Sequence, residues 1–236
     1  MSDAARGIVS KNLVQRILSA AVLAPVVLLA TWYGGAPFAL IILLIAVLAF
    51  VEWVAMTRGR GGGERAIWLG FGALYVVLPT AALIVLRGGD PAGWVGIAFI
   101  FAIVWATDTA AYFGGRSIGG PKLWRRVSPG KTWSGALTGF VAGIAAGVLV
   151  SRLGAGTSVP AAAGAAALLS IAAQLGDLLE SAVKRRFAVK DSGSVIPGHG
   201  GVLDRIDSLY GAAVAAWLLA AAGLSGQLFR SIGGPG

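Results

Sequence analysis

Seven long apolar stretches, separated by short polar segments, set the limits on how this chain can fold. They are Ile17–Tyr33, Phe38–Met56, Ile67–Leu86, Trp94–Phe113, Trp133–Val150, Val159–Glu180 and Ser208–Leu224. A helix needs about 20 apolar residues to cross a bilayer. Only 12% of the 236 residues are charged, about half the share typical of a soluble domain. We therefore predict an all-α, polytopic integral membrane protein with about seven transmembrane helices, the first of them an uncleaved span.

The cations predict how the helices are oriented. If the N-terminus lies inside, sixteen of the 19 Lys and Arg residues fall in inner segments, and only Arg87, Arg152 and Arg230 fall in outer ones. Cytoplasmic segments of membrane proteins are enriched in Lys and Arg. We expect a cytoplasmic N-terminus, an external C-terminus and chemistry on the cytoplasmic face. The net charge of +9 then reports topology and does not require a nucleic-acid partner.

We expect one membrane-embedded domain over residues 1–236, with an N-terminal three-helix part over about 1–90 and a catalytic part over about 91–236. Within the catalytic part, four glycines recur at every fourth position and share one helix face: Gly135, Gly139, Gly143 and Gly147. Small residues at this spacing let helix backbones approach closely in lipid. Packing within the chain is the favoured interpretation, and a homodimer seam is the alternative.

A carboxylate within or at the end of a span is costly, which makes it a functional candidate. Asp177 belongs to a polar stripe on an otherwise apolar helix, with Ser170, Gln174, Ser181 and Lys184. Asp108, Asp204 and Asp207 lie near the inner ends of other spans. Several carboxylates beside a basic cluster suggest an oxygen-ligated divalent cation, most plausibly magnesium holding a polyphosphate.

Simpler roles remain open for several of these carboxylates. Asp108 could be a helix-end group paired with Lys or Arg, and Asp207 could be the N-cap of the last helix. For Glu52, an ion pair with Arg58 or Arg60 is the expected role. Glu180 is expected to pair with Lys184 four residues later.

Two basic, glycine-rich loops are the candidate phosphate-binding segments. In the first, Ser128-Pro129-Gly130-Lys131-Thr132 predicts a tight turn at a helix entrance, where free N–H groups attract anions. A nucleotide-binding P-loop is excluded there, because the first glycine of that motif and the preceding strand are missing. The alternative is a cationic flank that only sets topology.

The second loop, from Ser181 to Asp207, contains the turn Pro197-Gly198-His199-Gly200-Gly201. Glycines let a backbone approach a ligand closely, and four cations could neutralise phosphates: Lys184, Arg185, Lys190 and Arg205. With no cysteine and His199 as the single histidine, a thiolate or multi-histidine metal site is excluded.

This second loop resembles the signature of the phosphatidate cytidylyltransferases, also called CDP-diglyceride synthetases. That pattern is S-x-x-K-R, then K-D, then a small residue, then P-G-H-G-G-x-x-D-R-x-D. The chain supplies every position: Ser181, Lys184, Arg185, Lys190, Asp191, Gly193, Pro197, Gly198, His199, Gly200, Gly201, Asp204, Arg205 and Asp207. The resemblance extends to Gln174–Ser181, Ser128–Gly135 and Asp108–Tyr112, whereas the first three spans match only as apolar segments. Ser134 departs from the family, which often has Glu or Gln there.

The resemblance implies transfer of the cytidylyl group from CTP to phosphatidate, giving CDP-diacylglycerol and pyrophosphate for phospholipid synthesis. Magnesium is implied, alone or with a second cation, as is a bacterial-type inner membrane location. We assign Asp177, Asp204, Asp207 and Asp108 to metal, and Asp177, Asp204, Lys184, Arg205 and His199 to catalysis. Substrate contacts are assigned to Ser128, Lys131, Ser181, Arg185, Lys190, Gly198, Gly200 and Gly201.

Two other activities compete with this one. A CTP-dependent polyprenol or phytol kinase would transfer the γ-phosphoryl group to a lipid alcohol, but the intact second loop argues against it. A transporter would have charges spread through the depth of the membrane, whereas here they gather at one face.

Overall fold

The computed structural model describes residues 21–88, 91–193, 200–224 and 228–229. The first helix is described over Ala21–Tyr33. The longer helices that follow are α2 (Gly35–Met56), α3 (Gly62–Arg87), α4 (Trp94–Ser117), α5 (Trp133–Val150), α6 (Val159–Arg186) and α7 (Leu203–Ala221). A short 3₁₀ turn (Pro91–Gly93) precedes α4, and a π-helical turn (Ser151–Ala155) follows α5. Within the described residues, every predicted apolar stretch is therefore helical.

Five of these helices are long and apolar enough to cross a membrane: α2, α3, α4, α5 with its π-helical turn, and α6. The described part of the first helix is shorter, and α7 is not among the five. The prediction of a polytopic membrane protein therefore agrees with the structure. The count of seven spans stays a prediction.

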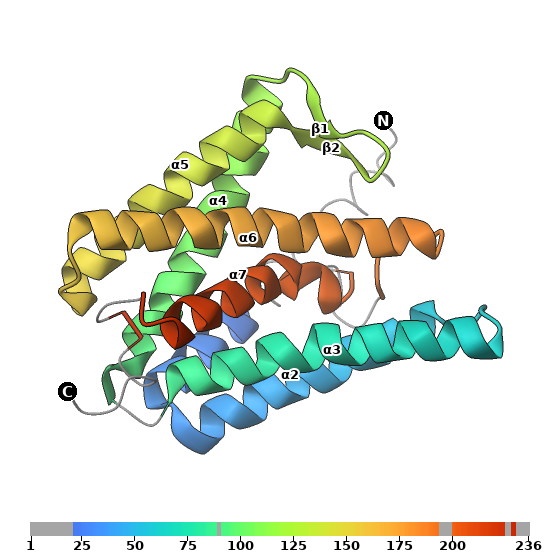
Figure 1. Cartoon of the computed structure of the whole chain (residues 1–236), viewed down its shortest axis with the longest axis horizontal. Helices are drawn as coiled ribbons and strands as arrows, with labels where there is room; N and C mark the ends of the chain where they lie inside the picture. Colours follow the sequence, from blue (N-terminus) through green and yellow to red (C-terminus); the bar gives the residue numbers. More distant parts are fainter. Residues whose placement is uncertain (1–20, 89–90, 194–199, 225–227, 230–236) are drawn as a thin grey trace, which may run out of the picture.

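Figure 1 shows α2 and α3 side by side in one layer, with α7 between that pair and α6. The helices α4 and α5 pack along each other and cross the layer of α6. The α2–α3 connection, the end of α6 and the start of α7 lie toward the right of Figure 1, as does the segment after α4. The α5–α6 connection and the start of α4 lie toward the left. The cation-rich connections thus gather at one end of the molecule, as their charges predict.

The segment between α4 and α5 forms a β-hairpin, which a purely helical fold did not include. Strand β1 (Lys122–Trp124) pairs antiparallel with β2 (Ser128–Thr132), with Lys122 opposite Thr132 and Trp124 opposite Ser128. The prediction of a tight turn over Ser128–Thr132 is wrong, because the chain reverses at 125–127. Thr132 then caps α5, since its Oγ1 accepts a hydrogen bond from the N–H of Gly135 at 3.1 Å.

The glycine face of α5 is buried inside the chain. A Cβ at Gly139 would lie 2.6 Å from the carbonyl oxygen of Thr107 on α4, and one at Gly147 would lie 2.6 Å from the Cβ of Ala166 on α6. Packing within the chain is confirmed. The alternative of a homodimer seam on this face is wrong, because α4 and α6 already cover it.

Arg87, predicted as an outer-loop cation, is instead buried at the end of α3. Its Nε donates to the carbonyl of Thr31 at 2.6 Å, and its NH2 group donates to that of Trp32 at 2.8 Å. A cation suits the free carbonyls at the end of a helix. Arg87 therefore ties the end of the first helix to α3.

Candidate active site

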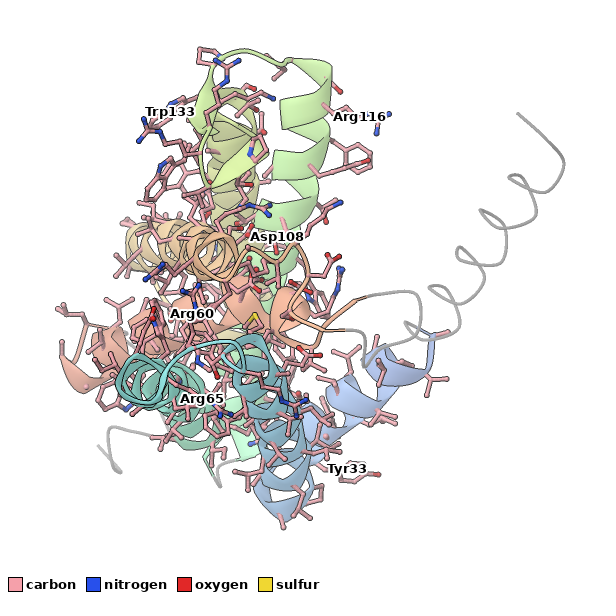
Figure 2. The ribbon with its side chains drawn as sticks, turned by 90° about the vertical axis from the view of Figure 1, so that its right-hand side faces the viewer. Tyr33, Arg60, Arg65, Asp108, Arg116 and Trp133 are labelled. Atoms are coloured by element: carbon pink, nitrogen blue, oxygen red, sulfur yellow. The ribbon has the colours of Figure 1, made fainter. Side chains whose placement is uncertain are left out.

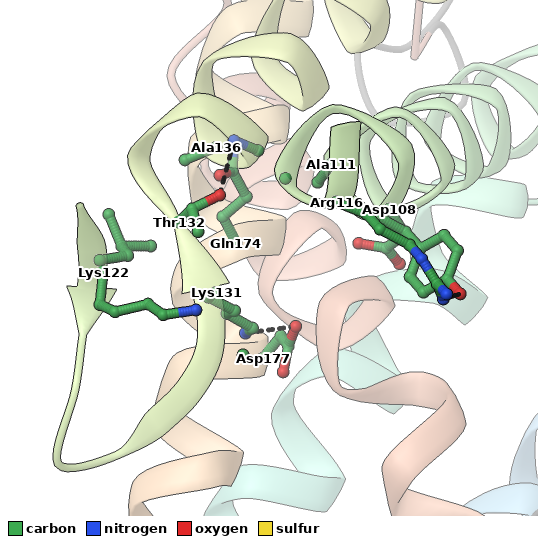
Figure 3. Close-up of a pocket in the computed structure, with 14 residues that line it drawn as sticks. Asp108, Ala111, Arg116, Lys122, Lys131, Thr132, Ala136, Gln174 and Asp177 are labelled. Atoms are coloured by element: carbon green, nitrogen blue, oxygen red, sulfur yellow. Dashed lines mark hydrogen bonds and ion pairs between the residues drawn. The ribbon is translucent and has the colours of Figure 1, made fainter. Parts of the chain in front are cut away.

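A cavity of about 610 Å³ opens between the hairpin and helices α4, α5 and α6, within the range of small-ligand sites. Figure 3 shows the side chains that line it. The charged ones are Asp108, Arg116, Lys122, Lys131 and Asp177, and Tyr112, Thr132 and Gln174 add polar atoms. The wall thus has three cations and two carboxylates, which fits a ligand that carries both phosphate groups and metal.

Lys131 on β2 and Asp177 on α6 form an ion pair across this cavity (Figure 3). Both side chains are about one-quarter to one-third exposed, at 26% and 30%. Ser181, one turn along α6, donates to Asp177 Oδ1 at 3.4 Å. The polar stripe on α6 faces the protein as predicted, because its member Ser170 hydrogen-bonds Thr107 of α4 at 2.8 Å.

Asp108 and Asp207 approach the same region from α4 and α7. Ser208 Oγ donates to Asp108 at 3.3 Å, and Asp207 interacts electrostatically with both Asp108 and Asp177. The helix-end alternative for Asp108 is wrong, because α4 continues to Ser117. The N-cap alternative for Asp207 is also wrong, because α7 begins at Leu203.

Asp204 belongs to a neighbouring cluster. Lys184 Nζ lies 2.6 Å from Asp204 Oδ1 and 2.5 Å from Glu180 Oε2, which confirms the predicted pairing of Glu180 with Lys184. The N–H groups of Ser192 and Gly201 each donate to Asp204 Oδ2 at 3.0 Å. Burial raises the pKa of the Asp204 carboxyl, but the hydrogen bonds from Lys184, Ser192 and Gly201 outweigh burial and hold that pKa below its ordinary value.

The other predicted residues lie in several places. Arg185 is exposed and donates to the carbonyls of Val127 and Val189, at 3.2 and 3.1 Å, so it fastens the hairpin to the end of α6. Lys190 and Arg205 are exposed and are not among the residues lining this cavity, and neither is Ser128. Gly200 and Gly201 precede α7. Gly198 and His199 lie outside the described residues.

Sequence reasoning missed part of the cavity wall. Arg116 and Lys122 were counted only among the cations of the inner segments, although the glycines at 114–115, 119 and 120 around them were a usable signal. Ser134, the departure from the family pattern, donates to the carbonyl of Gly119 and hydrogen-bonds Thr132 Oγ1 at 3.0 Å. It therefore braces the segment before the hairpin.

The expected ion pair of Glu52 with Arg58 or Arg60 is wrong. Arg60 instead pairs with Glu64 at 3.6 Å. Glu52 is 3% exposed and accepts hydrogen bonds from three residues: Ser192 in the second loop, and Val202 and Leu203 at the start of α7. Figure 2 looks onto this end of the molecule, with Asp108 between the α4 end that carries Arg116 and the connection that carries Arg60.

The donor chemistry of the four carboxylates fits magnesium, because carboxylate oxygens are the hard ligands that it prefers. Asp108 and Asp177 line the cavity, and Asp204 lies in the neighbouring cluster. Asp177 and Asp204 are each paired with a lysine, Lys131 and Lys184 respectively. Among the described residues, no three acidic or histidine side chains already form a metal-binding group.

Comparison with known proteins decides the family. The sequence matches the cytidylyltransferase family over residues 14–89 and 63–222. The chain belongs to this family.

Several bacterial members share much of the sequence, and each of the following is named phosphatidate cytidylyltransferase. The protein from Brucella suis is 40% identical over 256 aligned positions, which cover 89% of this chain and 94% of that protein. The one from Rickettsia bellii is 36% identical, over 84% of this chain and 86% of its own. The Bacillus subtilis protein is 36% identical, over 71% and 62%. The cytidylyltransferase match includes the N-terminal helices, which resembled the family only as apolar segments.

Proposed function

We propose that this chain transfers the cytidylyl group of CTP to phosphatidate, giving CDP-diacylglycerol and pyrophosphate. The observation that carries this activity is the match to phosphatidate cytidylyltransferases over most of the chain. The mixed-charge cavity beside apolar helices supports it, because one substrate is a soluble polyanion and the other a lipid. The acyl chains remain in the bilayer.

The reaction itself requires little acid–base chemistry. A phosphate oxygen of phosphatidate attacks the α-phosphorus of CTP, a new P–O bond forms, and the bond to the β-phosphate breaks to release pyrophosphate. Because the attacking phosphate is already ionised at neutral pH, no strong base is needed. The barrier lies in bringing two polyanions together, which requires positive charge.

The cations of the cavity supply part of that charge. Lys131, Lys122 and Arg116 contact phosphate oxygens of CTP and pyrophosphate. Lys131 is paired with Asp177. If this pair opened, Lys131 would be able to bind phosphate, and Asp177 would be one of the residues that hold the metal.

Asp177, Asp204, Asp207 and Asp108 would hold magnesium, alone or with a second cation. When bound, the ion offsets the charge of the triphosphate and of the leaving pyrophosphate. Asp204 and Lys184, both assigned to catalysis from the sequence, pair with each other where α7 begins against α6. Replacing Asp108 with Asn should raise the magnesium concentration needed for half-maximal turnover about ten-fold, whereas the exposed Asp191→Asn should leave it unchanged.

The residues of the second loop keep the roles assigned from the sequence. His199 and Arg205 belong to the catalytic set. The substrate contacts are Ser181, Arg185, Lys190, Gly198, Gly200 and Gly201. The match to the family signature supports these roles.

The position of the label in CTP tests the activity. The purified protein, given phosphatidate and magnesium, should convert CTP labelled at the α-phosphorus into a labelled lipid. CTP labelled at the γ-phosphorus should yield labelled pyrophosphate and no labelled lipid. A γ-labelled lipid with release of CDP would instead identify a lipid kinase.

We also propose that the N-terminus and the cavity face the cytoplasm, in a bacterial-type inner membrane. The cation asymmetry and the bacterial relatives support this. The chain has no cysteine, so Gly62→Cys and Leu153→Cys report on opposite ends. In right-side-out vesicles an impermeant thiol reagent should label only Leu153→Cys, and the reverse pattern would contradict the orientation. A homodimer would have to use a face other than the glycine stripe.

A further inference from the structure

Glu52 makes an unusual set of contacts for a buried acidic side chain. It lies near the end of α2 and is 3% exposed. Its carboxylate accepts hydrogen bonds from Ser192 Oγ at 2.9 Å, from the N–H of Val202 at 2.9 Å and from the N–H of Leu203 at 3.0 Å. Among the described residues no Lys or Arg forms an ion pair with it. Hydrogen bonds from a distant part of the chain therefore balance this buried charge.

These contacts complete the start of α7. The first N–H groups of a helix have no partner within the helix, and the side chain of the N-cap residue Val202 supplies none. Glu52 takes the N–H groups of Val202 and Leu203, and Asp204 takes that of Gly201. A negative group at this end also suits the helix dipole. A residue of α2 thus caps a helix that begins about 150 positions later.

Two glycines of the second loop pack directly on the Glu52 carboxylate. A Cβ at Gly193 would lie 2.6 Å from Glu52 Oε1, and a Cβ at Gly201 would lie 2.7 Å from Oε2. Neither has a positive φ. The close approach to Glu52 explains Gly193, whereas a Cβ at Gly201 would meet Ser192 Oγ, the hydroxyl that donates to Glu52, as well as the carboxylate itself. The chain on both sides of residues 194–199 is therefore held against one side chain.

We propose that Glu52 is a positioning residue for the second loop and for α7. By fixing Ser192 and Leu203 it sets both ends of the segment that contains His199, and with them the start of the helix that carries Asp207. It contacts none of the reacting groups in this account. The effect on turnover rests on the proposed cytidylyl transfer, whereas the effect on the backbone does not.

The test begins with Glu52→Gln, which keeps the size but leaves one good acceptor and places an N–H donor against other donors. The turnover number of the folded protein should fall roughly ten-fold or more, with a smaller change in the KM for CTP. The backbone amides over 200–204 should exchange with deuterium at least about ten-fold faster. Glu64→Gln, an exposed carboxylate at the same end, should change neither quantity.

A double substitution tests whether Glu52 acts through the loop. In the native background Gly193→Ala should lower turnover about ten-fold, because its methyl group meets the Glu52 carboxylate. In a Glu52→Ala background, Gly193→Ala should have little further effect on turnover, since the carboxylate that the methyl group would meet is gone. Ser192→Ala, which removes one of the three hydrogen bonds, should give a smaller loss and serves if Glu52→Gln fails to fold.

Three results would overturn the proposal. The first is unchanged amide exchange over 200–204 in Glu52→Gln or Ser192→Ala, and the second is independent losses from Glu52→Ala and Gly193→Ala. The third is normal turnover per folded molecule in Glu52→Gln. Faster exchange in a protein whose native form makes no lipid-linked cytidylate would support the anchoring and contradict the proposed activity.

Discussion

The N-terminal and the C-terminal helices both bury charged side chains, but these side chains have different kinds of partner. In the N-terminal part, Arg87 and Glu52 are almost fully buried, and both form hydrogen bonds with backbone groups at helix ends. In the C-terminal part, Lys131 and Asp177 pair with each other on the wall of a cavity and keep about a quarter to a third of their surface exposed. The first arrangement fixes helices, and the second leaves charge within reach of a ligand.

This contrast distinguishes two roles of a charged residue in an apolar helix. Burying either kind of charge costs free energy, so burial alone does not identify a reaction site. The groups that pair with the charge are what distinguish such a site. A charge satisfied by the backbone has no exchangeable contact, whereas a charge satisfied by another side chain can release it when a substrate arrives.

Loss of Asp177 should have the largest effect. Asp177→Asn keeps the size of the side chain but removes the charge that would hold metal, so turnover should fall at least about a hundred-fold. Pyrophosphate release by the purified protein measures this. Glu64→Gln, a charge change in the N-terminal part, should leave turnover intact. Near-normal turnover of Asp177→Asn at limiting magnesium would place the reaction elsewhere.

Lys131 should come next, and Arg58 provides a control. Lys131→Gln removes a cation from the cavity wall and should lower kcat/KM for CTP about 10- to 100-fold, the value of one charge-assisted hydrogen bond. Arg58→Gln removes an exposed cation of the α2–α3 connection that is not among the cavity-lining residues, and should cost about three-fold or less. If Arg58→Gln has the larger effect, the cavity is not where CTP binds.

Arg87 should affect stability and leave activity unchanged. Arg87→Met leaves the carbonyls of Thr31 and Trp32 without their donor, which should lower the free energy of unfolding by about 2 kcal/mol. Thermal unfolding in detergent would show this as a lower Tm. The turnover of the remaining folded protein should equal that of the native chain, and a loss of turnover at full folding would show that the N-terminal part does more than hold helices together.

Replacing a glycine with alanine should affect the stability of the protein differently in the two parts. Gly139→Ala on α5 places a methyl group 2.6 Å from the Thr107 carbonyl oxygen and should destabilise the protein by about 1 kcal/mol or more. Gly70→Ala on α3 meets nothing within 4 Å and should be neutral or stabilising by about 0.5–1 kcal/mol. Equal Tm values for the two variants would mean that α4 and α5 can separate enough to accommodate the added methyl group.

The helices were predictable because their signal is local. Apolar stretches, cation asymmetry and the four-residue glycine repeat each report directly on spans, on sidedness or on close packing. The stripe that carries Asp177 was equally visible, because its polar members recur on one face of a helix. Each of these patterns needs only neighbouring residues to be read.

The contacts of Glu52 and the hairpin were not predictable, because both depend on pairing between segments that no local pattern indicates. Nothing near Glu52 in the sequence points to Val202, and the nearby Arg60 suggested a false partner. The hairpin is only two short strands containing Pro129 and Gly130, residues that usually mark turns. The segment Ser128–Thr132 is a strand because it pairs with Lys122–Trp124, and no local pattern predicts this pairing.

Exchange of the two charged residues tests most directly whether the Lys131–Asp177 pair is a reaction centre. The double variant Lys131→Asp with Asp177→Lys keeps one cation and one anion across the cavity, so an ion pair that only stabilised the fold would be restored. Our account predicts a Tm near that of the native protein and turnover at least about a hundred-fold lower, because the carboxylate no longer faces Asp108 and Asp207. Recovery of turnover together with stability would contradict it.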